Sequence, residues 1–222
     1  MLKLIQLSQE GGSYSSIEKK DLLAASGASL AVLNGLLKKN ILVESTQEIS
    51  RFGSYNGEQL EDKNLSEAQQ NAYEQVVEGF EDSKPVLLHG ITGSGKTEIY
   101  VKLIRDQIAL GNQVLYLLPE IALTTQLITR LRKYFGDKIG VYHSRFSPNE
   151  RVEVWKSVIN ENLQQYDVII GARSSVFLPF RRLGLIVIDE EHESSFKQYD
   201  PAPRYHARDV AFKLSKLHQC QV

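Results

Sequence analysis

Apolar residues recur at helical spacing three times in the first forty positions of the chain, and each recurrence predicts a short helix. The apolar positions are Leu4, Ile5 and Leu7 for the first helix, Ile17, Leu22 and Leu23 for the second, and Leu30, Leu33, Leu36 and Leu37 for the third. The pair Gly11-Gly12 ends the first pattern, and Gly27 ends the second. Ser15 and Glu18 have capping-box spacing, and Ser29 is placed to cap the third helix.

Two short β-forming runs, residues 41–45 and 48–52, follow these helices and predict a hairpin. Three helices followed by a hairpin is the element order of a winged-helix domain, which we expect at residues 1–52. The third helix of such a domain can enter a DNA groove, but a small helical docking module would have the same element order. Residues 1–64 hold seven basic and eight acidic side chains and therefore show no basic stripe that would favour DNA contact.

The pattern changes after a polar stretch, residues 53–64, which we interpret as a linker. Strands are predicted at 85–90, 113–119, 138–144, 166–171 and 183–189, and helices at 66–80, up to 110, up to about 135 and around Trp155. Near-continuous apolar strands that alternate with helices are typical of βαβ units. The sequence therefore predicts an α/β domain over residues 65–222, with a parallel sheet covered on both faces.

Composition narrows the class of protein. The chain has 222 residues, of which 42% are hydrophobic and 24% are charged, so it is not dominated by disorder. Cys220 is the single cysteine, which excludes an internal disulfide or a thiolate zinc cluster and fits a reducing compartment. No apolar run approaches the length of a membrane span, and the first residues lack the features of a secretory signal. The formal net charge of −1 neither demands nor excludes a polyanionic partner.

Residues 90–97 match the phosphate-binding pattern G-x-x-x-x-G-K-[ST], between a predicted strand and a predicted helix. Glycines let successive backbone amides face an anion, and the helix that follows adds its positive end. Lys96 would reach the β- and γ-phosphates, and the Thr97 hydroxyl would ligate Mg²⁺. The predicted nucleotide-binding residues here are Gly90, Thr92, Gly93, Ser94, Gly95, Lys96 and Thr97. The alternative is an ordinary glycine-rich turn before a helix.

The last predicted strand ends in acidic residues, which supply the second half of such a site. Asp189 directly follows four apolar residues and is the expected Mg²⁺ partner, because a carboxylate at the end of a buried strand is costly without a cation. Glu190 is placed to orient or deprotonate an attacking water. Glu191 could be a solvated loop charge, and His192 a polar residue at the strand end, although His192 adjoins the carboxylates. Together the two halves predict an ATP- or GTP-binding core with Mg²⁺.

With both nucleotide motifs in view, the chain resembles superfamily 2 helicases that carry a DEEH form of the Walker B motif. More closely, it resembles their primosomal replication-restart family, from about Leu65 to the end. The resemblance rests on six ordered segments, namely LSEAQQNAY, LLHGITGSGKTEIY, LYLLPEIALTTQL, VYHSRFSPNERVEVW, VIIGARSSVFLPF and LGLIVIDEEHESSFKQYDPAPRYHARD. It implies that the α/β domain is a RecA-like P-loop NTPase lobe, preceded by a winged-helix domain.

The resemblance also implies roles for residues outside the phosphate loop. Gln69 would hydrogen-bond adenine and so favour ATP over GTP, although it could equally be an exposed helix residue. Pro119 and Glu120 match a segment that contacts the phosphates of single-stranded DNA. Arg173 and Ser174 match a later segment that lies near the DNA path. The stretch 171–182 holds three arginines and no acids, which suggests a local basic patch unless it is simply a solvated loop.

The loop after the acidic residues interleaves aromatic and basic side chains, which is the pattern that single strands need for base stacking and phosphate contact. Its residues are Phe196, Lys197, Tyr199, Arg204, Tyr205, His206 and Arg208. In the resembled family this loop senses DNA and couples it to ATP hydrolysis, and His192 is expected to take part. The alternative is that these rings pack on the core as a hydrophobic plug between lobes.

The resemblance implies an ATP-dependent 3′–5′ DNA helicase of replication restart in the bacterial cytoplasm. Its partners would be single-stranded and forked DNA, primosome proteins and single-strand-binding protein, with no membrane. The chain lacks the family's second lobe with its arginine finger, its zinc module and its domain for the DNA 3′ end. We therefore expect a fragment that binds Mg²⁺ and ATP, hydrolyses ATP slowly and does not unwind DNA alone; zinc would belong to the absent part.

Two other functions share these motifs. A superfamily 2 translocase, or the motor of a nuclease from another repair or restriction system, would carry the same nucleotide site. A nucleotide-switched DNA-binding adaptor would need Asp189 but no water-activating carboxylate, so the role of Glu190 separates it from a motor.

Overall fold

The computed structural model describes residues 19–43, 57, 60, 64–82, 84–91, 93–120, 125–144, 146–159 and 166–222. The chain divides into two compact units, Met1–Ile49 and Ser50–Val222. The predicted first helix, the second strand of the predicted hairpin and most of the predicted linker lie outside the described residues. Among the residues that are described, no helix is long and apolar enough to cross a membrane.

The described part of the first unit contains two helices, α2 (Lys19–Ser26) and α3 (Leu30–Lys38). Leu22 on α2 is buried with Leu33 and Leu36 on α3, as the helical spacing predicted. Gly27 follows α2 at φ +64°, a left-handed conformation that glycine adopts without strain. Ser29 precedes α3, but its side chain makes no capping hydrogen bond, so that detail of the prediction is wrong. Residues 41–43 form a bend rather than a strand.

The second unit alternates helices and strands. The helices are α4 (Glu67–Glu81), α5 (Lys96–Ala109), α6 (Thr125–Phe135), α7 (Pro148–Ile159) and α8 (Ala207–His218), and the strands are β1 (Gln113–Leu117), β2 (Ile139–Tyr142), β3 (Val168–Gly171) and β4 (Leu183–Ile188). Short 3₁₀ helices lie at η1 (Gly136–Lys138), η2 (Arg173–Phe177) and η3 (Ser194–Phe196). All of these α-helices and strands except α8 match predicted elements, and α8 is one that the sequence analysis did not anticipate.

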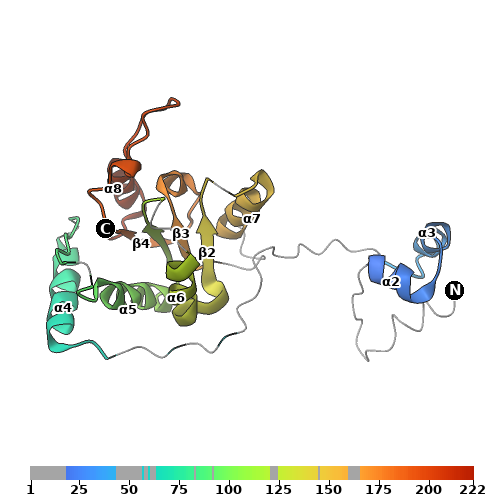
Figure 1. The fold of residues 1–222 in the computed structure, drawn as a ribbon, viewed down its shortest axis with the longest axis horizontal. Helices are drawn as coiled ribbons and strands as arrows, with labels where there is room; N and C mark the ends of the chain where they lie inside the picture. The colour runs from blue at the N-terminus through green and yellow to red at the C-terminus, as the bar shows by residue number, and fades with distance from the viewer. Residues whose placement is uncertain are drawn as a thin grey trace. The chain divides into compact units, whose positions relative to one another are not determined.

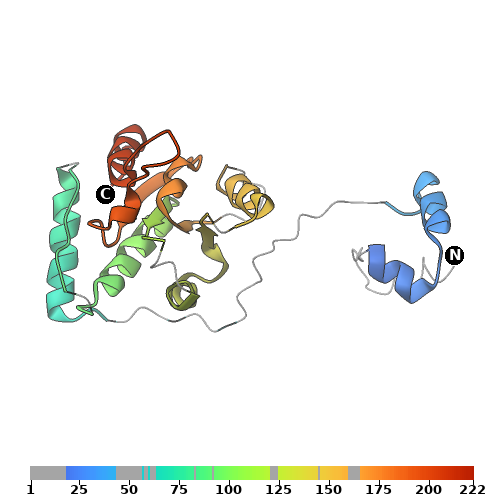
Figure 2. The ribbon, with the colours of Figure 1, turned by 45° about the horizontal axis from the view of Figure 1, so that its top comes forward.

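The four strands are parallel and run in the order β2-β3-β1-β4. Alternate residues of the central strand β1 face opposite sides: Val114 and Tyr116 pack with α4, α5 and α6, whereas Leu115 and Leu117 pack with α7 and α8. Figures 1 and 2 show α5 and α6 on one face of the sheet and α7 and α8 on the other. The predicted parallel sheet with two covered faces is therefore confirmed.

The predicted strand at residues 85–90 is wrong, because these residues belong to no strand of the sheet. The Val86 amide donates to the Val222 carbonyl at 2.9 Å, and Gln221 forms a parallel bridge with Leu185 of β4. Residues 221–222 therefore lie between β4 and residue 86. A strand requires a hydrogen-bonded ladder, and beyond Val86 this segment faces a cavity instead.

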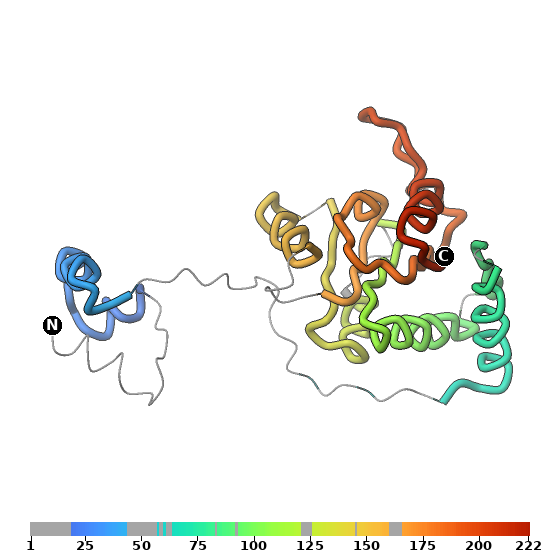
Figure 3. The backbone as a smooth tube through the Cα atoms, turned by 180° about the vertical axis from the view of Figure 1, so that it is seen from behind, coloured from blue at the N-terminus to red at the C-terminus, as the bar shows by residue number. Residues whose placement is uncertain are grey.

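The hairpin after β4 projects from the body of the lobe. Lys197 and His206 form an antiparallel bridge at its base, and Figures 1 and 3 show the orange-red chain between them extending away from the sheet. The Gln198 amide donates to the carbonyls of Pro201 and Pro203 at 2.8 and 3.0 Å. These bonds hold the hairpin closed from within.

Candidate functional site

The glycine-rich loop before α5 has the backbone shape that its sequence predicts. Gly93 and Gly95 have φ values of +82° and +86°, which other residues rarely adopt, and α5 begins at Lys96 directly afterwards. The Lys96 ammonium donates to the Gly90 carbonyl at 2.6 Å and so lies back over the loop. Thr92 lies outside the described residues. The loop therefore presents a helix N-terminus and a lysine to one side.

Gln69 connects α4 to this loop. Its side-chain oxygen accepts from the Ser66 amide at 2.9 Å, while the Ser66 hydroxyl accepts from the Gln69 amide, which forms a capping box at the start of α4. The Gln69 side-chain nitrogen donates to the Gly95 carbonyl at 3.3 Å. Gln69 is therefore half-buried against the phosphate loop rather than fully exposed. Its predicted contact with adenine stays a prediction.

Asp189 follows β4 at the carboxyl edge of the sheet, where the Tyr116 hydroxyl donates to its Oδ2 at 3.0 Å and the Glu190 amide donates to its Oδ1 at 3.1 Å. Burial raises the pKa of the Asp189 carboxyl above its usual value, and the Glu190 charge adds to the rise. The Tyr116 hydrogen bond and the Lys96 charge both oppose it. Sequence reasoning missed Tyr116, because a tyrosine within an apolar strand looks like an ordinary core residue.

Glu190 adopts a left-handed backbone conformation with φ +51°, which is uncommon for a residue with a side chain. Its carbonyl accepts from the Glu193 amide at 2.9 Å, so a tight turn follows the strand. Its carboxylate is exposed and lies 3.9 Å from His192 Nε2. Glu191 forms an ion pair with Arg208 of α8 at 2.8 Å, which is a more specific contact than the solvated loop charge considered above.

Both halves of the predicted nucleotide site line one cavity of about 570 Å³. Its lining consists of Asn64, Gln69, Ile91, Gly93, Ser94, Gly95, Lys96, Thr97, Glu98, Arg130, Asp189 and Glu190. Residues about ninety positions apart in the chain therefore meet, as the two motifs require. Sequence reasoning missed Glu98 and Arg130, which lie outside both motifs.

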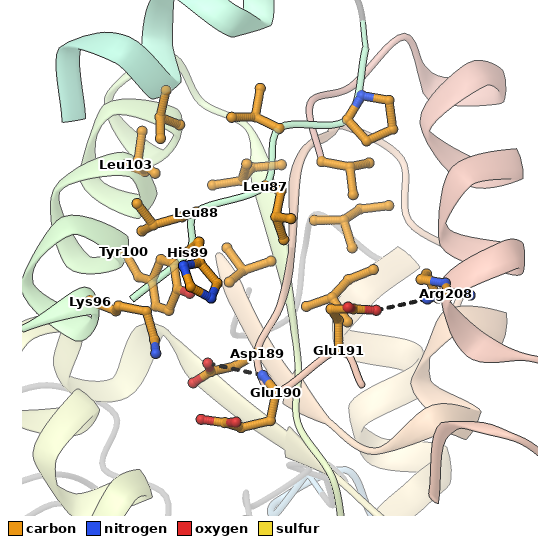
Figure 4. Close-up of a pocket in the computed structure, with 18 of the residues that line it drawn as sticks. Leu87, Leu88, His89, Lys96, Tyr100, Leu103, Asp189, Glu190, Glu191 and Arg208 are labelled. Carbon is orange, nitrogen blue, oxygen red and sulfur yellow. Dashed lines mark hydrogen bonds and ion pairs between the residues drawn. The ribbon is translucent and has the colours of Figure 1, made fainter. Parts of the chain in front are cut away.

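A second cavity of about 570 Å³ adjoins the first and lies between residues 85–90 and β4. Figure 4 shows Leu87, Leu88 and Leu103 toward one end of it, and Lys96, Asp189 and Glu190 gathered at the other. Its apolar end lacks the charged groups that a phosphate would need. The first cavity is therefore the better candidate for an anionic ligand.

The residues present fit a magnesium ion bound together with a phosphate ligand. Asp189 offers a partly desolvated carboxylate, and Thr97 offers a hydroxyl on the wall of the same cavity. Mg²⁺ commonly takes one or two protein ligands and completes its shell with substrate phosphates and water. Within the described ranges, no group of three or more His, Cys, Asp or Glu side chains is placed to hold a metal by itself.

The residues expected near DNA follow the carboxyl ends of β1 and β3, which share one edge of the sheet. Glu120 is exposed and accepts a hydrogen bond from Ser144 at 3.1 Å, whereas Pro119 is buried. The expected contact of this segment with DNA stays a prediction, and the burial of Pro119 leaves its side chain little access to a ligand. Ser174 is half-buried after β3.

The expected basic patch at residues 171–182 is also wrong. Arg173 follows β3 at the carboxyl edge of the sheet, whereas Arg181 and Arg182 precede β4 at the opposite edge. The strands are parallel, so their starts and ends lie on different sides of the lobe. Arg173 donates to the carbonyls of Ser195 and Lys197, both at 3.3 Å, and thereby holds the base of the projecting hairpin.

The aromatic residues of the loop after Asp189 have different surroundings. Phe196 is 0% exposed and belongs to the core on the α7 and α8 face, so its expected role in stacking with bases is wrong. Its neighbours are apolar, and burial of the ring removes it from water. Tyr199 is 67% exposed, as expected for a stacking residue. Tyr205 is half-buried and packs edge-on against Phe177, a 57% exposed ring that sequence reasoning missed.

The basic residues of the same loop differ in their exposure. Arg204 is exposed near the hairpin tip, and Lys197 is half-buried at its base. His192 is exposed beside Glu190. His206 accepts a hydrogen bond from the Arg208 amide at 3.3 Å and caps α8. The hairpin therefore presents Tyr199 and Arg204 to solvent, while its base is fixed by polar contacts.

Comparisons with known proteins agree with this geometry. Residues 66–221 match the family model of DEAD/DEAH box helicases, and residues 1–49 match a model of the winged helix domain of PriA helicase from Bacteroidota. The replication restart protein PriA of Synechocystis is 41% identical over 98% of this chain, and that of Bacillus subtilis is 39% identical over 93%. The chain spans about a quarter of the length of these relatives, 25% and 26%.

A solved structure of RecG bound to a three-way DNA junction shares the fold with a TM-score of 0.51 and 24% identity. The likeness covers 72% of this chain and 24% of that one. The resemblance to superfamily 2 replication-restart helicases inferred from the residues is confirmed by the family models and the PriA relatives. A family model that matches most of the chain, together with a phosphate loop and an acidic strand end on one cavity, shows that the chain belongs to the DEAD/DEAH box helicase family.

Proposed function

We propose that this chain is the ATP-binding part of an ATP-dependent 3′–5′ DNA helicase that acts in replication restart. The observation that carries the proposal is the convergence of the glycine-rich loop, Lys96, Asp189 and Glu190 on a single cavity. The relatives that supply the biological setting are replication restart proteins. Translocation direction is taken only from the family resemblance of the sequence motifs. The helicase would act in the bacterial cytoplasm, where the chromosome lies.

The phosphate loop would bind the triphosphate. The amides around Gly93 and Gly95 and the N-terminus of α5 would face the anion, and Lys96 would leave the Gly90 carbonyl to reach the β- and γ-phosphates. Gln69 already contacts Gly95 and would turn one end of its amide to adenine. This exchange of an internal hydrogen bond for a ligand contact would couple nucleotide binding to the start of α4.

Thr97 and Asp189 would hold the Mg²⁺ that accompanies ATP, and the ion would supply charge neutralisation for the phosphates. Tyr116 and the Glu190 amide orient the Asp189 carboxylate toward the cavity. Glu190 would accept the proton of the attacking water, because its exposed carboxylate lies at the cavity wall beside Asp189. His192 would link this carboxylate to the DNA side.

The projecting hairpin would bind single-stranded DNA. Tyr199 offers an exposed ring for stacking and Arg204 a cation for phosphates. Arg173 and Lys197 would position the hairpin base, and Glu120, Ser174 and the half-buried Tyr205 would border the DNA path along the same sheet edge. Forked DNA, primosome proteins and single-strand-binding protein are the proposed partners of the whole protein.

The proposed organisation assigns residues 1–52 to a winged-helix domain, 53–64 to a linker and 65–222 to the first, RecA-like motor lobe. The family models at 1–49 and 66–221 support this division. Zinc has no proposed role here, because one cysteine cannot form a thiolate cluster.

The direct test is titration of a fluorescent ATP analogue into the folded 222-residue chain with Mg²⁺, followed by anisotropy. We expect saturable binding that unlabelled ATP displaces better than GTP. We also expect slow turnover and no strand displacement on forked DNA by this chain alone. Absence of saturable binding by folded protein would overturn the proposal.

An adaptor that only switches shape with ATP is the second candidate, and the winged-helix match at the N-terminus favours considering it. The two functions differ in what they require of Glu190. In a protein of the full relative's length, Glu190→Gln should abolish ATP turnover and keep ATP affinity if the chain is part of a motor. The control is Glu191→Gln, because the Glu191 side chain pairs with Arg208 and does not line the first cavity. Unchanged turnover in Glu190→Gln would refute the assigned role.

A further inference from the structure

We propose that Arg130 is a second phosphate-binding cation of the nucleotide site, which Glu98 holds until the triphosphate displaces that carboxylate. The inference rests on the proposed ATP-binding function and adds a residue to it. Arg130 belongs to neither sequence motif and lies on α6, a helix that the phosphate-loop pattern does not include.

The position of Arg130 is fixed by its neighbour in the chain. Leu131 is fully buried in the core between α6 and the sheet, which anchors this turn of the helix. Arg130 then lines the cavity together with Lys96, Thr97 and Glu98. Its side chain is 47% exposed, so the guanidinium lies at the mouth of the cavity with room to move.

Glu98 is the present partner of Arg130, and their side chains form an ion pair between α5 and α6. Glu98 lies in the first turn of α5, one residue after the predicted magnesium ligand Thr97, and its side chain is only 15% exposed. A carboxylate at this place occupies space beside the phosphate loop. Because the Glu98 carboxylate binds the Arg130 guanidinium, it holds that group beside the region that the phosphates would enter.

The charges of the cavity lining also favour the proposal. Its acidic residues are Glu98, Asp189 and Glu190, and Lys96 and Arg130 are the only Lys or Arg side chains among the described residues that line it. When Glu98 neutralises Arg130, Lys96 alone faces the other two carboxylates. A triphosphate that displaced Glu98 would gain a planar guanidinium able to bind two phosphate oxygens at once.

The alternative is that Glu98 and Arg130 merely join α5 to α6. A joining role predicts that loss of either side chain acts alike, on stability and not on nucleotide affinity. A phosphate-binding role predicts opposite effects. Loss of Arg130 removes a ligand contact, whereas loss of Glu98 removes the group that competes with phosphate.

The experiment uses the 222-residue chain and a fluorescent ATP analogue with Mg²⁺. We expect Arg130→Gln to weaken binding about tenfold, as for one charge-assisted hydrogen bond to phosphate. Lys133→Gln, which removes the same charge from an exposed position on the same helix, should change affinity less than twofold. Arg130→Lys should recover only part of the loss, because a lysine cannot bind two oxygens in the same planar way.

Glu98→Gln supplies the sharper test. We expect it to leave affinity unchanged or to raise it several-fold, because Arg130 is released. In the double variant Arg130→Gln/Glu98→Gln, the gain in affinity that depends on Arg130 should be absent. If Glu98→Gln acted only by changing the overall charge of the cavity, its gain would persist and add to the effect of Arg130→Gln. Thermal unfolding without nucleotide separates either effect from a loss of stability.

Equal losses of affinity in Arg130→Gln and Glu98→Gln would overturn the inference, as would wild-type affinity in Arg130→Gln. Either result leaves the proposed function intact if the wild-type chain binds ATP. Failure of the wild-type chain to bind ATP would instead refute the proposed function itself.

Discussion

The carboxyl end of β4 and the hairpin that follows it are neighbours in the chain but are held in different ways. At the end of β4, two donors from separate parts of the chain converge on the Asp189 carboxylate. In the hairpin, Arg173 and Gln198 instead donate to backbone carbonyls, and Tyr199, two residues after the bridged Lys197, is left exposed. The first arrangement fixes the direction of a charge, and the second fixes the path of a loop.

This difference explains why charged and aromatic motif residues behave differently. A carboxylate or an ammonium must face a cavity, a partner or solvent, so its position follows from its charge. An aromatic ring can be buried in the core or exposed to a ligand, and both are favourable in the right surroundings. Phe196 and Tyr199, three residues apart, take these two outcomes.

The largest expected effect is a difference in the free energy of unfolding between variants of Phe196 and Tyr199. Phe196→Ala should lower the free energy of unfolding by about 3–5 kcal/mol, because it leaves a cavity at a fully buried position. Tyr199→Ala should change it by less than about 0.5 kcal/mol, because its ring contributes little to the core. Urea unfolding followed by circular dichroism measures both. Similar midpoints for the two variants would contradict the contrast.

Lys96→Ala tests the charged side of the comparison. It should weaken binding of Mg²⁺ and ATP roughly 10- to 100-fold, because the phosphate loop loses its charge-assisted contact. Lys102→Ala is the matched control, since Lys102 lies on the same helix over the Tyr73 ring and away from the cavity. Anisotropy titration compares the two, and an equal effect from both would indicate that only overall charge matters.

Tyr199→Ala should also weaken binding of single-stranded DNA by about tenfold, which corresponds to the loss of one stacked base. Trp155→Ala removes an exposed ring from α7 and serves as the control, with little expected change. Fluorescence-polarisation titration with a labelled oligonucleotide gives both affinities. If Trp155→Ala had the larger effect, the DNA path would lie elsewhere on the lobe.

The smallest effect concerns the stability cost of Asp189. Its pKa is raised in the folded chain, so folding favours the protonated form, and this stabilisation is lost as pH rises through the raised pKa. In nucleotide-free protein, Asp189→Asn should therefore raise the free energy of unfolding at pH 8 by up to about 1 kcal/mol while impairing Mg²⁺ binding.

The gain from Asp189→Asn should be smaller at pH 4 than at pH 8, because protonation of the native carboxyl removes the cost of burying its charge. Glu190→Gln should give a smaller gain at pH 8, because it removes only the repulsion that the Glu190 charge exerts on Asp189. Thermal unfolding at the two pH values measures the difference, and a loss of stability in Asp189→Asn at pH 8 would contradict the physical account of this site.

Much of the lobe could be predicted because its strands are short apolar runs bounded by turns. Residues 113–119 and 183–189 gave strands close to their observed limits, and these two strands pair with each other in a sheet whose two faces are covered. Residues 85–90 have the same apolar character but form no strand, since pairing depends on which chain lies alongside. The apolar composition of a segment does not determine which other segment lies beside it.

The candidate site was predictable to the extent that motifs carry it. The two motifs identified residues that do line one cavity, namely Gly93 to Thr97 and the acid after β4. Tyr116, Glu98 and Arg130 had no such signal, because each reaches the cavity from an element whose local pattern is ordinary. Arg173 had a signal, but its bonds to the hairpin carbonyls could not be anticipated from spacing.

The sequence by itself determined the α/β class, the parallel sheet and the glycine-rich turn before α5, because these follow from local periodicity and from the backbone freedom of glycine. Only the tertiary structure decided which side chains share a cavity, which rings are buried and which arginines lie at the same edge of the sheet. Those outcomes depend on contacts between residues far apart in the chain, and a local sequence pattern does not specify such contacts.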